Sequence, residues 1–292
     1  MPRIADARLK PLLELLYDRY GAGFLASDPI CIPRRWAEPD DREVVAFLAT
    51  ALAYGRVAQI QASLARLLAT MGPHPARSVR AFEPAAGRRK LRGFVHRFND
   101  ARDIGLLLYF MRQMIESHGS IEGFFMAGHA AGDDDVGPSL ASFVRRALAL
   151  DCAPYYPSGR LPDEAGVRFF LPSPEDGSTC KRLNLFLRWM VRPDDGVDFG
   201  QWRAVAPAEL VIPLDTHVSR IAGAIGLTRR RTVDWKMAME VTRRLRRLDP
   251  VDPIRYDFAL SRLGILQGCP RHPRPARCEL CELTSGRLRP AS

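Results

Sequence analysis

Lys181 stands at a place where a lysine is poorly suited to stabilise a helix. It opens a largely apolar segment that follows a turn-rich stretch, residues 171–179. The pattern predicts a buried helix capped by Ser178 or Thr179. The helix dipole is positive at this end, so the dipole and partial burial together should lower the pKa of the amine. A neutral amine can attack a sugar carbon and form a Schiff base. The alternative is that Lys181 only solvates the end of a core helix.

Asp215 is the second residue that could take part in chemistry. It lies in residues 211–226, where Pro213 fixes the entry to a helix and Gly226 ends it. One interpretation is an N-cap that stabilises the protein by about 1 kcal/mol. A capping carboxylate is also rigidly held, and beside a cleft it could deprotonate a lysine and stabilise a cationic sugar. His217, two residues later, is expected to be structural.

Helical periodicity dominates the elements that must position these two residues. Apolar residues recur at three- and four-residue spacings, and no period-two series predicts strands. The predicted fold class is therefore all-α. The expected helices cover residues 7–19, a long segment capped by Asp40 or Asp41, and residues 56–70, 92–117, 138–150, 179–191, 216–225, 233–248 and 253–263.

The charge balance favours a polyanionic partner. Lys and Arg number 43 against 33 acidic residues, which gives a net charge of +10. Neutralising phosphates releases counterions and supplies affinity that does not depend on nucleotide sequence. Basic residues concentrate in residues 229–247, whose other interpretation is a solvated helix face. Arg182, Arg188 and Arg220 are further candidates for phosphate contacts.

Other classes of protein fit the sequence less well. The N-terminus carries charges where a signal peptide needs an apolar stretch, and no apolar run approaches a membrane-spanning length. The six cysteines do not form a secreted disulfide framework. We therefore expect a cytoplasmic, nucleoid-associated monomer with no membrane contact.

The two segments around Lys181 and Asp215 together resemble the helix-hairpin-helix base-excision glycosylase superfamily, which includes endonuclease III. Lys181 matches the catalytic lysine, and the stretch IPLDTHVSRIA, with Pro213, Asp215 and Arg220, matches the aspartate motif. The 34-residue gap between the lysine and the aspartate is closer to that of archaeal 8-oxoguanine glycosylases. The whole chain also resembles a bacterial family labelled only as a domain of unknown function, through the signatures GSxCKRLNxFLRWMVR and IPLDTHVxRIA.

The resemblance implies a DNA-repair glycosylase with abasic-site lyase activity. Lys181 would form the Schiff base and Asp215 would assist, on an oxidised base such as 8-oxoguanine in damaged duplex DNA. A different-lesion enzyme and a non-catalytic DNA-binding protein are the alternatives. Gly177, Ser178 and Thr179 of the hairpin would bind the DNA backbone. The early Tyr54-Gly55-Arg56 turn would fill the gap left by the extruded base, and its alternative is an ordinary turn between helices.

The resemblance also predicts two helical lobes with the hairpin at the cleft between them. Lobe one would cover approximately residues 40–192, and lobe two residues 1–39 plus 193–264. Residues 265–292 would form a cysteine-containing tail.

The tail departs from the four-cysteine pattern of endonuclease III, C-x6-C-x2-C-x5-C, which holds a [4Fe-4S] cluster. Here the spacing is C-x8-C-x2-C, and Arg287 stands where the fourth cysteine would fall. Cys269, His272, Cys278 and Cys281 have the ligand types and layout of a zinc site. A degenerate [4Fe-4S] site, a zinc site and a metal-free tail all remain open.

Overall fold

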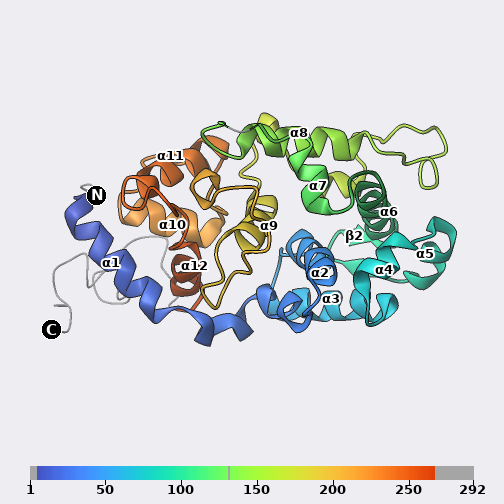
Figure 1. The fold of residues 1–292 in the computed structure, drawn as a ribbon, viewed down its shortest axis with the longest axis horizontal. Coiled ribbons are helices and arrows are strands. Elements are labelled where there is room, and N and C mark those ends of the chain that lie inside the picture. The colour runs from blue at the N-terminus through green and yellow to red at the C-terminus, as the bar shows by residue number, and fades with distance from the viewer. Residues whose placement is uncertain (1–4, 131, 267–292) are drawn as a thin grey trace.

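The computed structural model describes residues 5–130 and 132–266, and in these residues nearly all of the regular secondary structure is helical (Figure 1). The α-helices are α1 (Asp6–Arg19), α2 (Pro39–Ala51), α3 (Val57–Met71), α4 (Pro75–Arg80), α5 (Pro84–Lys90), α6 (Ala101–His118), α7 (Ile121–Met126), α8 (Gly137–Leu148), α9 (Lys181–Val191), α10 (Thr216–Ala224), α11 (Trp235–Arg246) and α12 (Asp257–Leu266). The 3-10 helices are η1 (Ala22–Ser27), η2 (Pro29–Cys31), η3 (Pro33–Arg35), η4 (Gly166–Phe170), η5 (Pro174–Asp176) and η6 (Pro207–Glu209). The all-α prediction is confirmed.

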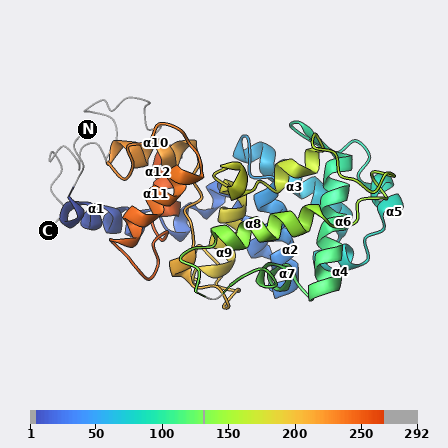
Figure 2. The same cartoon turned by 90° about the horizontal axis from the view of Figure 1, so that it is seen from above.

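Two groups of helices lie on either side of α9. Figures 1 and 2 show α1, α10, α11 and α12 on one side and α2 to α8 on the other. Helix α9 packs against α2, and α12 packs against both α10 and α1. The buried apolar side chains form one continuous cluster through both groups. Residues that open α9 and α10 therefore lie near the junction of the two groups.

Helix α9 is buried along almost its whole length. Every residue from Arg182 to Val191 is buried, as the apolar sequence predicts. The first residue, Lys181, is the exception, because it is only partly buried. Lys181 is thus the one residue of α9 that is partly accessible.

Several expected helix limits were wrong, and the last helix, expected from residue 253, begins at Asp257. Residues 92–117 were predicted as one helix, but β1 (Val95–His96) and β2 (Asn99–Asp100) form a short antiparallel hairpin before α6 begins. The side chain of Asp100 accepts hydrogen bonds from the backbone N–H groups of residues 102 and 103, and this capping box fixes the start of α6. Helix α2 begins at Pro39, before Asp40 and Asp41, and Glu38 is its N-cap without a side-chain bond.

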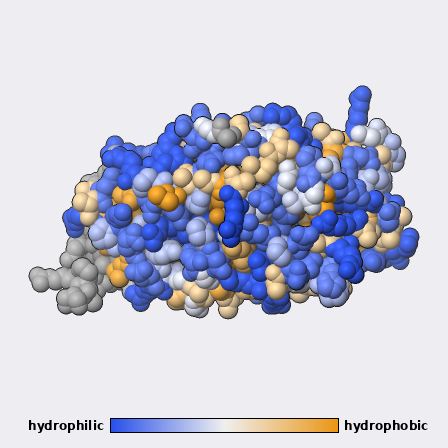
Figure 3. Space-filling view, viewed as in Figure 1, coloured by the Kyte–Doolittle hydropathy of each residue, from blue (hydrophilic) through white to orange (hydrophobic). Residues whose placement is uncertain are grey.

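The surface in Figure 3 is mainly hydrophilic on the side shown, with apolar residues scattered over it. Among the described residues, no helix has the length and apolar character needed to cross a bilayer. Several arginines at the C-terminal side of the fold are exposed. They are Arg229, Arg230, Arg231, Arg243 and Arg247.

Candidate active site

The helix that carries Lys181 does not begin with the expected cap. Its N-cap is Cys180, whose backbone is left-handed (φ 48°, ψ 33°) and whose side chain makes no cap bond. The Ser178 hydroxyl instead accepts a hydrogen bond from the Cys180 N–H at 3.2 Å. The buried Cys180 thiol donates to the Pro172 carbonyl, with 3.3 Å between Sγ and O. The expectation of a Ser178 or Thr179 cap was therefore wrong.

The Lys181 ammonium group is held against the turn between α2 and α3. Its Nζ donates to the backbone carbonyl of Ala53 at 3.2 Å. Burial lowers the pKa of Lys181, and the carboxylates of Asp215 and Asp28 oppose that effect. The lowered amine pKa predicted from the sequence is confirmed in direction, and burial is its main cause.

Asp215 is the N-cap of α10, as predicted. Its Oδ1 accepts hydrogen bonds from the backbone N–H groups of His217 and Val218, both at 2.8 Å. Asp215 and Lys181 line the same cavity, which has a volume of about 80 Å³. We call this the inner cavity. The two residues that sequence reasoning selected separately are thus brought together.

The inner cavity is lined by more charged residues than the sequence predicted. Its charged lining consists of Asp28, Lys181, Arg188, Asp215, Asp257 and Arg262. Arg262 pairs with Asp28 at 2.9 Å, and Arg188 Nη1 donates to Asp257 Oδ2 at 2.6 Å. Sequence reasoning missed Asp28, Asp257 and Arg262 as site residues. The signal that could have found two of them is the presence of charges within the apolar run of α12, at Asp257 and Arg262.

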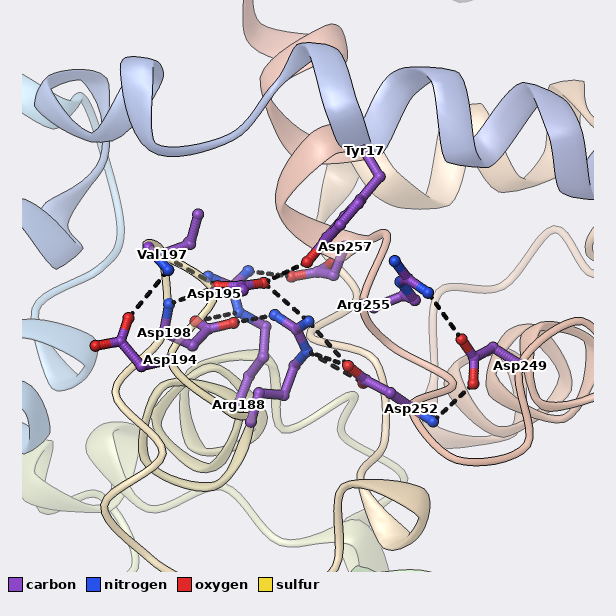
Figure 4. Close-up of polar contacts among 12 residues, drawn as sticks. Tyr17, Arg188, Asp194, Asp195, Val197, Asp198, Asp249, Asp252, Arg255 and Asp257 are labelled. Carbon is purple, nitrogen blue, oxygen red and sulfur yellow. Dashed lines mark hydrogen bonds and ion pairs between the residues drawn. The ribbon is translucent and has the colours of Figure 1, made fainter.

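Behind the inner cavity lies a buried set of ion pairs, the arginine–aspartate network, part of which is shown in Figure 4. Arg188 bridges Asp257 and Asp198, and its Nε lies 3.1 Å from Asp198 Oδ1. Arg192 pairs with Asp198, Asp195 and Asp252. Arg188 is only 1% exposed. The prediction that it contacts a phosphate is therefore wrong, because its guanidinium is buried beside Asp198 and Asp257 and does not reach the surface.

A wider groove opens on the other side of Lys181. It has a volume of about 360 Å³, and we call it the outer groove. Its lining includes Ala53, Tyr54, Phe169, Thr179, Lys181 and Arg182. Lys181 and Ala53 line both spaces, so the amine lies where the outer groove meets the inner cavity.

Aromatic rings form one wall of the outer groove. The Tyr54 and Phe169 rings meet at 4.8 Å between centroids, and Phe98, at the tip of the hairpin, meets Phe169 at 4.5 Å. Phe98 is 62% exposed. Arg182 stacks on Phe169, with its guanidinium carbon 3.7 Å from the ring centroid, and donates to the Phe169 carbonyl. Arg182 is buried in this position, so only a group inside the groove could reach it.

The other predicted DNA-binding residues are divided between the groove and the surface. Gly177 is exposed in a left-handed turn (φ 73°), and the partly exposed Ser178 and Thr179 line the outer groove. Arg56 is exposed, whereas the partly buried Arg220 lines neither space.

Tyr54 is held in the wall of the groove. Its hydroxyl donates to Asn99 Oδ1 at 2.6 Å and contacts the His96 carbonyl at 3.1 Å. Because these contacts tie the phenol to the hairpin, Tyr54 is not an exposed side chain ready to enter a base stack. The gap-filling role of the Tyr54-Gly55-Arg56 turn stays a prediction, and within this turn Arg56 is the exposed side chain.

The predicted metal ligands of the tail, Cys269, His272, Cys278 and Cys281, lie outside the described residues. Within the residues that are described, no group of three or more His, Cys, Asp or Glu side chains is arranged to hold a metal ion. Larger hollows exist elsewhere, such as one of about 880 Å³ beside Trp235 and Arg243. It is lined by Lys236 and Asp135, but Lys236 is exposed, unlike Lys181.

Comparison with known proteins gives one match. The model of a family described as "Protein of unknown function (DUF2400)" matches residues 28–266. The matched segment contains every polar residue of the inner cavity and ends before the cysteines of the tail. No curated protein and no solved structure matches the chain.

Proposed function

Because the chain belongs to the DUF2400 family, whose description names no function, we propose a function from its site. The protein is proposed to be a DNA glycosylase with abasic-site lyase activity that removes an oxidised base, with 8-oxoguanine as the first candidate. One observation carries the proposal: Lys181, whose pKa is lowered, and Asp215, held as a helix cap, line one cavity. An amine nucleophile and a fixed carboxylate are the two groups that this chemistry requires.

Of the two spaces, only the outer groove has a volume that suits a nucleotide extruded from the duplex. The outer groove, at about 360 Å³, falls in the range of ligand pockets, roughly 300–1,000 Å³. The inner cavity, at about 80 Å³, is too small for that role. The extruded nucleotide therefore occupies the outer groove, where Tyr54 and Phe169 offer ring faces for stacking.

Lys181 acts as the nucleophile in the proposed reaction. Its lone pair attacks C1′, and the bond from C1′ to the base breaks, so that the electron pair leaves with the base. The new ammonium gives a proton to the departing base. The neutral nitrogen then forms the C=N bond with its lone pair as the C1′–O4′ bond breaks, and O4′ takes a proton from water. The resulting protonated imine makes the adjacent C2′ proton acidic, and its loss expels the 3′ phosphate by β-elimination.

Asp215 balances the positive charge that develops on the sugar during this step. Its rigid placement by two backbone N–H groups means that little reorganisation is needed as the charge appears. The exposed arginines at residues 229–231, with Arg243 and Arg247, supply contacts to the phosphate backbone, in keeping with the net charge of +10.

The test compares duplexes that contain 8-oxoguanine or an abasic site, with strand cleavage and base release as readouts. The chain has four lysines, and Lys10, Lys90 and Lys236 are exposed, unlike Lys181. Lys181→Gln should abolish both activities, while Lys236→Gln, the matched control, should keep them.

Base release that survives in Lys181→Gln would point to a glycosylase without the Schiff base. DNA binding with no base release and no cleavage on any lesion would identify a non-catalytic binding protein and refute the proposal.

A further inference from the structure

Asp257 is a buried carboxylate that the proposed reaction has not yet used. It lies at the first position of α12 and is only 2% exposed. Its Oδ2 accepts from Arg188, but its Oδ1 has no hydrogen-bond partner among the described residues. A buried carboxylate oxygen without a hydrogen-bond partner costs folding free energy. Because Asp257 lines the same cavity as Lys181, this oxygen is a candidate for a chemical role.

The three carboxylates of the inner cavity differ in how their oxygens are used. Asp28 has both oxygens engaged, one with the Ile30 N–H and the other with Arg262. Asp215 gives one oxygen to two backbone N–H groups as the cap of α10. Asp257 lines the inner cavity together with Lys181, and its Oδ1 is buried and has no hydrogen-bond partner among the described residues.

We propose that Asp257 accepts the ammonium proton of Lys181 and later returns it to the leaving hydroxyl group, an inference that rests on the proposed lyase function. In the first step an N–H bond of Lys181 breaks and an O–H bond of Asp257 forms. The neutral amine then adds to the C1′ aldehyde of an abasic site, which gives a carbinolamine. Asp257 gives its proton to the carbinolamine hydroxyl, water leaves, and the protonated imine remains. Asp257 ends as the carboxylate, so the cycle balances.

The electrostatics of the inner cavity support this exchange. Burial raises the pKa of Asp257 to about 6, although Arg188 opposes the rise. A proton acceptor with a pKa near neutrality suits acid–base work at physiological pH. Transfer from Lys181 to Asp257 also leaves the total charge of the cavity unchanged, which avoids creating net charge in a buried space. The other charged groups around Asp257 are Arg188, Asp198, Asp215, Asp28 and Arg262.

The first experiment measures the rate of Schiff-base formation with an abasic duplex, trapped by cyanoborohydride between pH 5 and pH 8. The wild-type rate should rise through an inflection near pH 6, as Asp257 becomes able to accept a proton. Asp257→Asn should lose this inflection and react about tenfold or more slowly at pH 7. Asp257→Glu should restore the inflection. Asp252→Asn, a control in the arginine–aspartate network that does not line the inner cavity, should keep the wild-type profile. A folded Asp257→Asn protein with the wild-type profile would overturn the proposal.

The second experiment does not depend on activity. Reductive methylation with ¹³C-formaldehyde labels the four lysines, and Lys181→Gln identifies the Lys181 signal by NMR. The Asp257 carboxylate raises the pKa of Lys181, so that pKa should fall in Asp257→Asn and stay unchanged in Asp252→Asn. In the wild type and in Asp252→Asn, but not in Asp257→Asn, the Lys181 signal should carry an extra inflection near pH 6 that Lys10, Lys90 and Lys236 lack.

The two experiments separate the two proposals. A wild-type protein that forms no adduct, yet shows the pH 6 inflection at Lys181, would refute the lyase function and support the proton exchange. A protein that forms the adduct, with a Lys181 signal that is insensitive to Asp257, would support the lyase and overturn the exchange.

Discussion

Loss of Arg188 should strongly destabilise the buried ion pairs behind the inner cavity. It is 1% exposed and joins two buried carboxylates, those of Asp198 and Asp257. In Arg188→Met both would remain buried without their shared counter-charge. Removing one partner of a buried ion pair costs about 3–5 kcal/mol. We therefore expect the free energy of unfolding at pH 8 to fall by that amount, measured by urea denaturation followed by circular dichroism.

The pH dependence of that loss tests the cause. Without Arg188 the pKa of Asp257 should rise further, because Arg188 is the group that opposes the effect of burial there, and the pKa of Asp198 should rise less, because Arg192 still opposes burial. A carboxyl whose pKa is raised in the folded state stabilises the protein at low pH, and that contribution is lost as pH rises through the folded pKa. The deficit of Arg188→Met should thus be smaller at pH 5 than at pH 8. Arg145→Met, which breaks an exposed pair with Glu175, should cost less than about 1 kcal/mol. A deficit below 1 kcal/mol for Arg188→Met, or one equal at both pH values, would refute the reasoning.

Three further predictions follow from the site and its supports. Asp215→Ser keeps a capping oxygen, so the free energy of unfolding should change by less than about 0.5 kcal/mol, whereas the rate of Schiff-base trapping should fall tenfold or more. A trapping rate that falls only as far as the loss of folded protein explains would mean that Asp215 is only a cap. Gly166→Ala would place a Cβ 2.3 Å from the Asp103 carboxylate and should cost about 1–3 kcal/mol in denaturant unfolding, whereas Gly223→Ala, with open space around it, should not destabilise. The pKa of Asp257 is raised to about 6, so wild-type stability should lose up to about 3 kcal/mol more than that of Asp257→Asn between pH 4 and pH 7; parallel pH profiles would contradict this.

Helices with strong amphipathic periodicity were predictable from the sequence. The expected segments 7–19 and 138–150 correspond closely to α1 and α8, because their apolar stripes face one core. The hairpin at residues 95–100 was not predictable in this way. Its strands have two residues each, too few for alternation to appear, and the buried His96 and Asn99 are polar.

The site was predictable only where its signals are local. Lys181 and Asp215 each open a helix, and the beginning of a helix leaves a recognisable sequence pattern. Asp28 and Arg262 form an ion pair although they are more than 230 residues apart in the sequence. No local sequence pattern around either residue predicts this pairing. The burial of Arg188 was not predictable either, because its partners Asp198 and Asp257 lie on other segments of the chain and the sequence interpretation treated arginines as surface charges. The contacts that hold Tyr54 come from the hairpin, which the sequence pattern did not predict.

The most direct test of the account is to find which residue becomes attached to DNA. The protein is incubated with a duplex that carries one abasic site, reduced with borohydride and digested, and the modified peptide is identified by mass spectrometry. We predict a single adduct on Lys181, with Lys10, Lys90 and Lys236 unmodified. The absence of any adduct, or its presence on one of the exposed lysines while Lys181 stays free, would contradict the central claim.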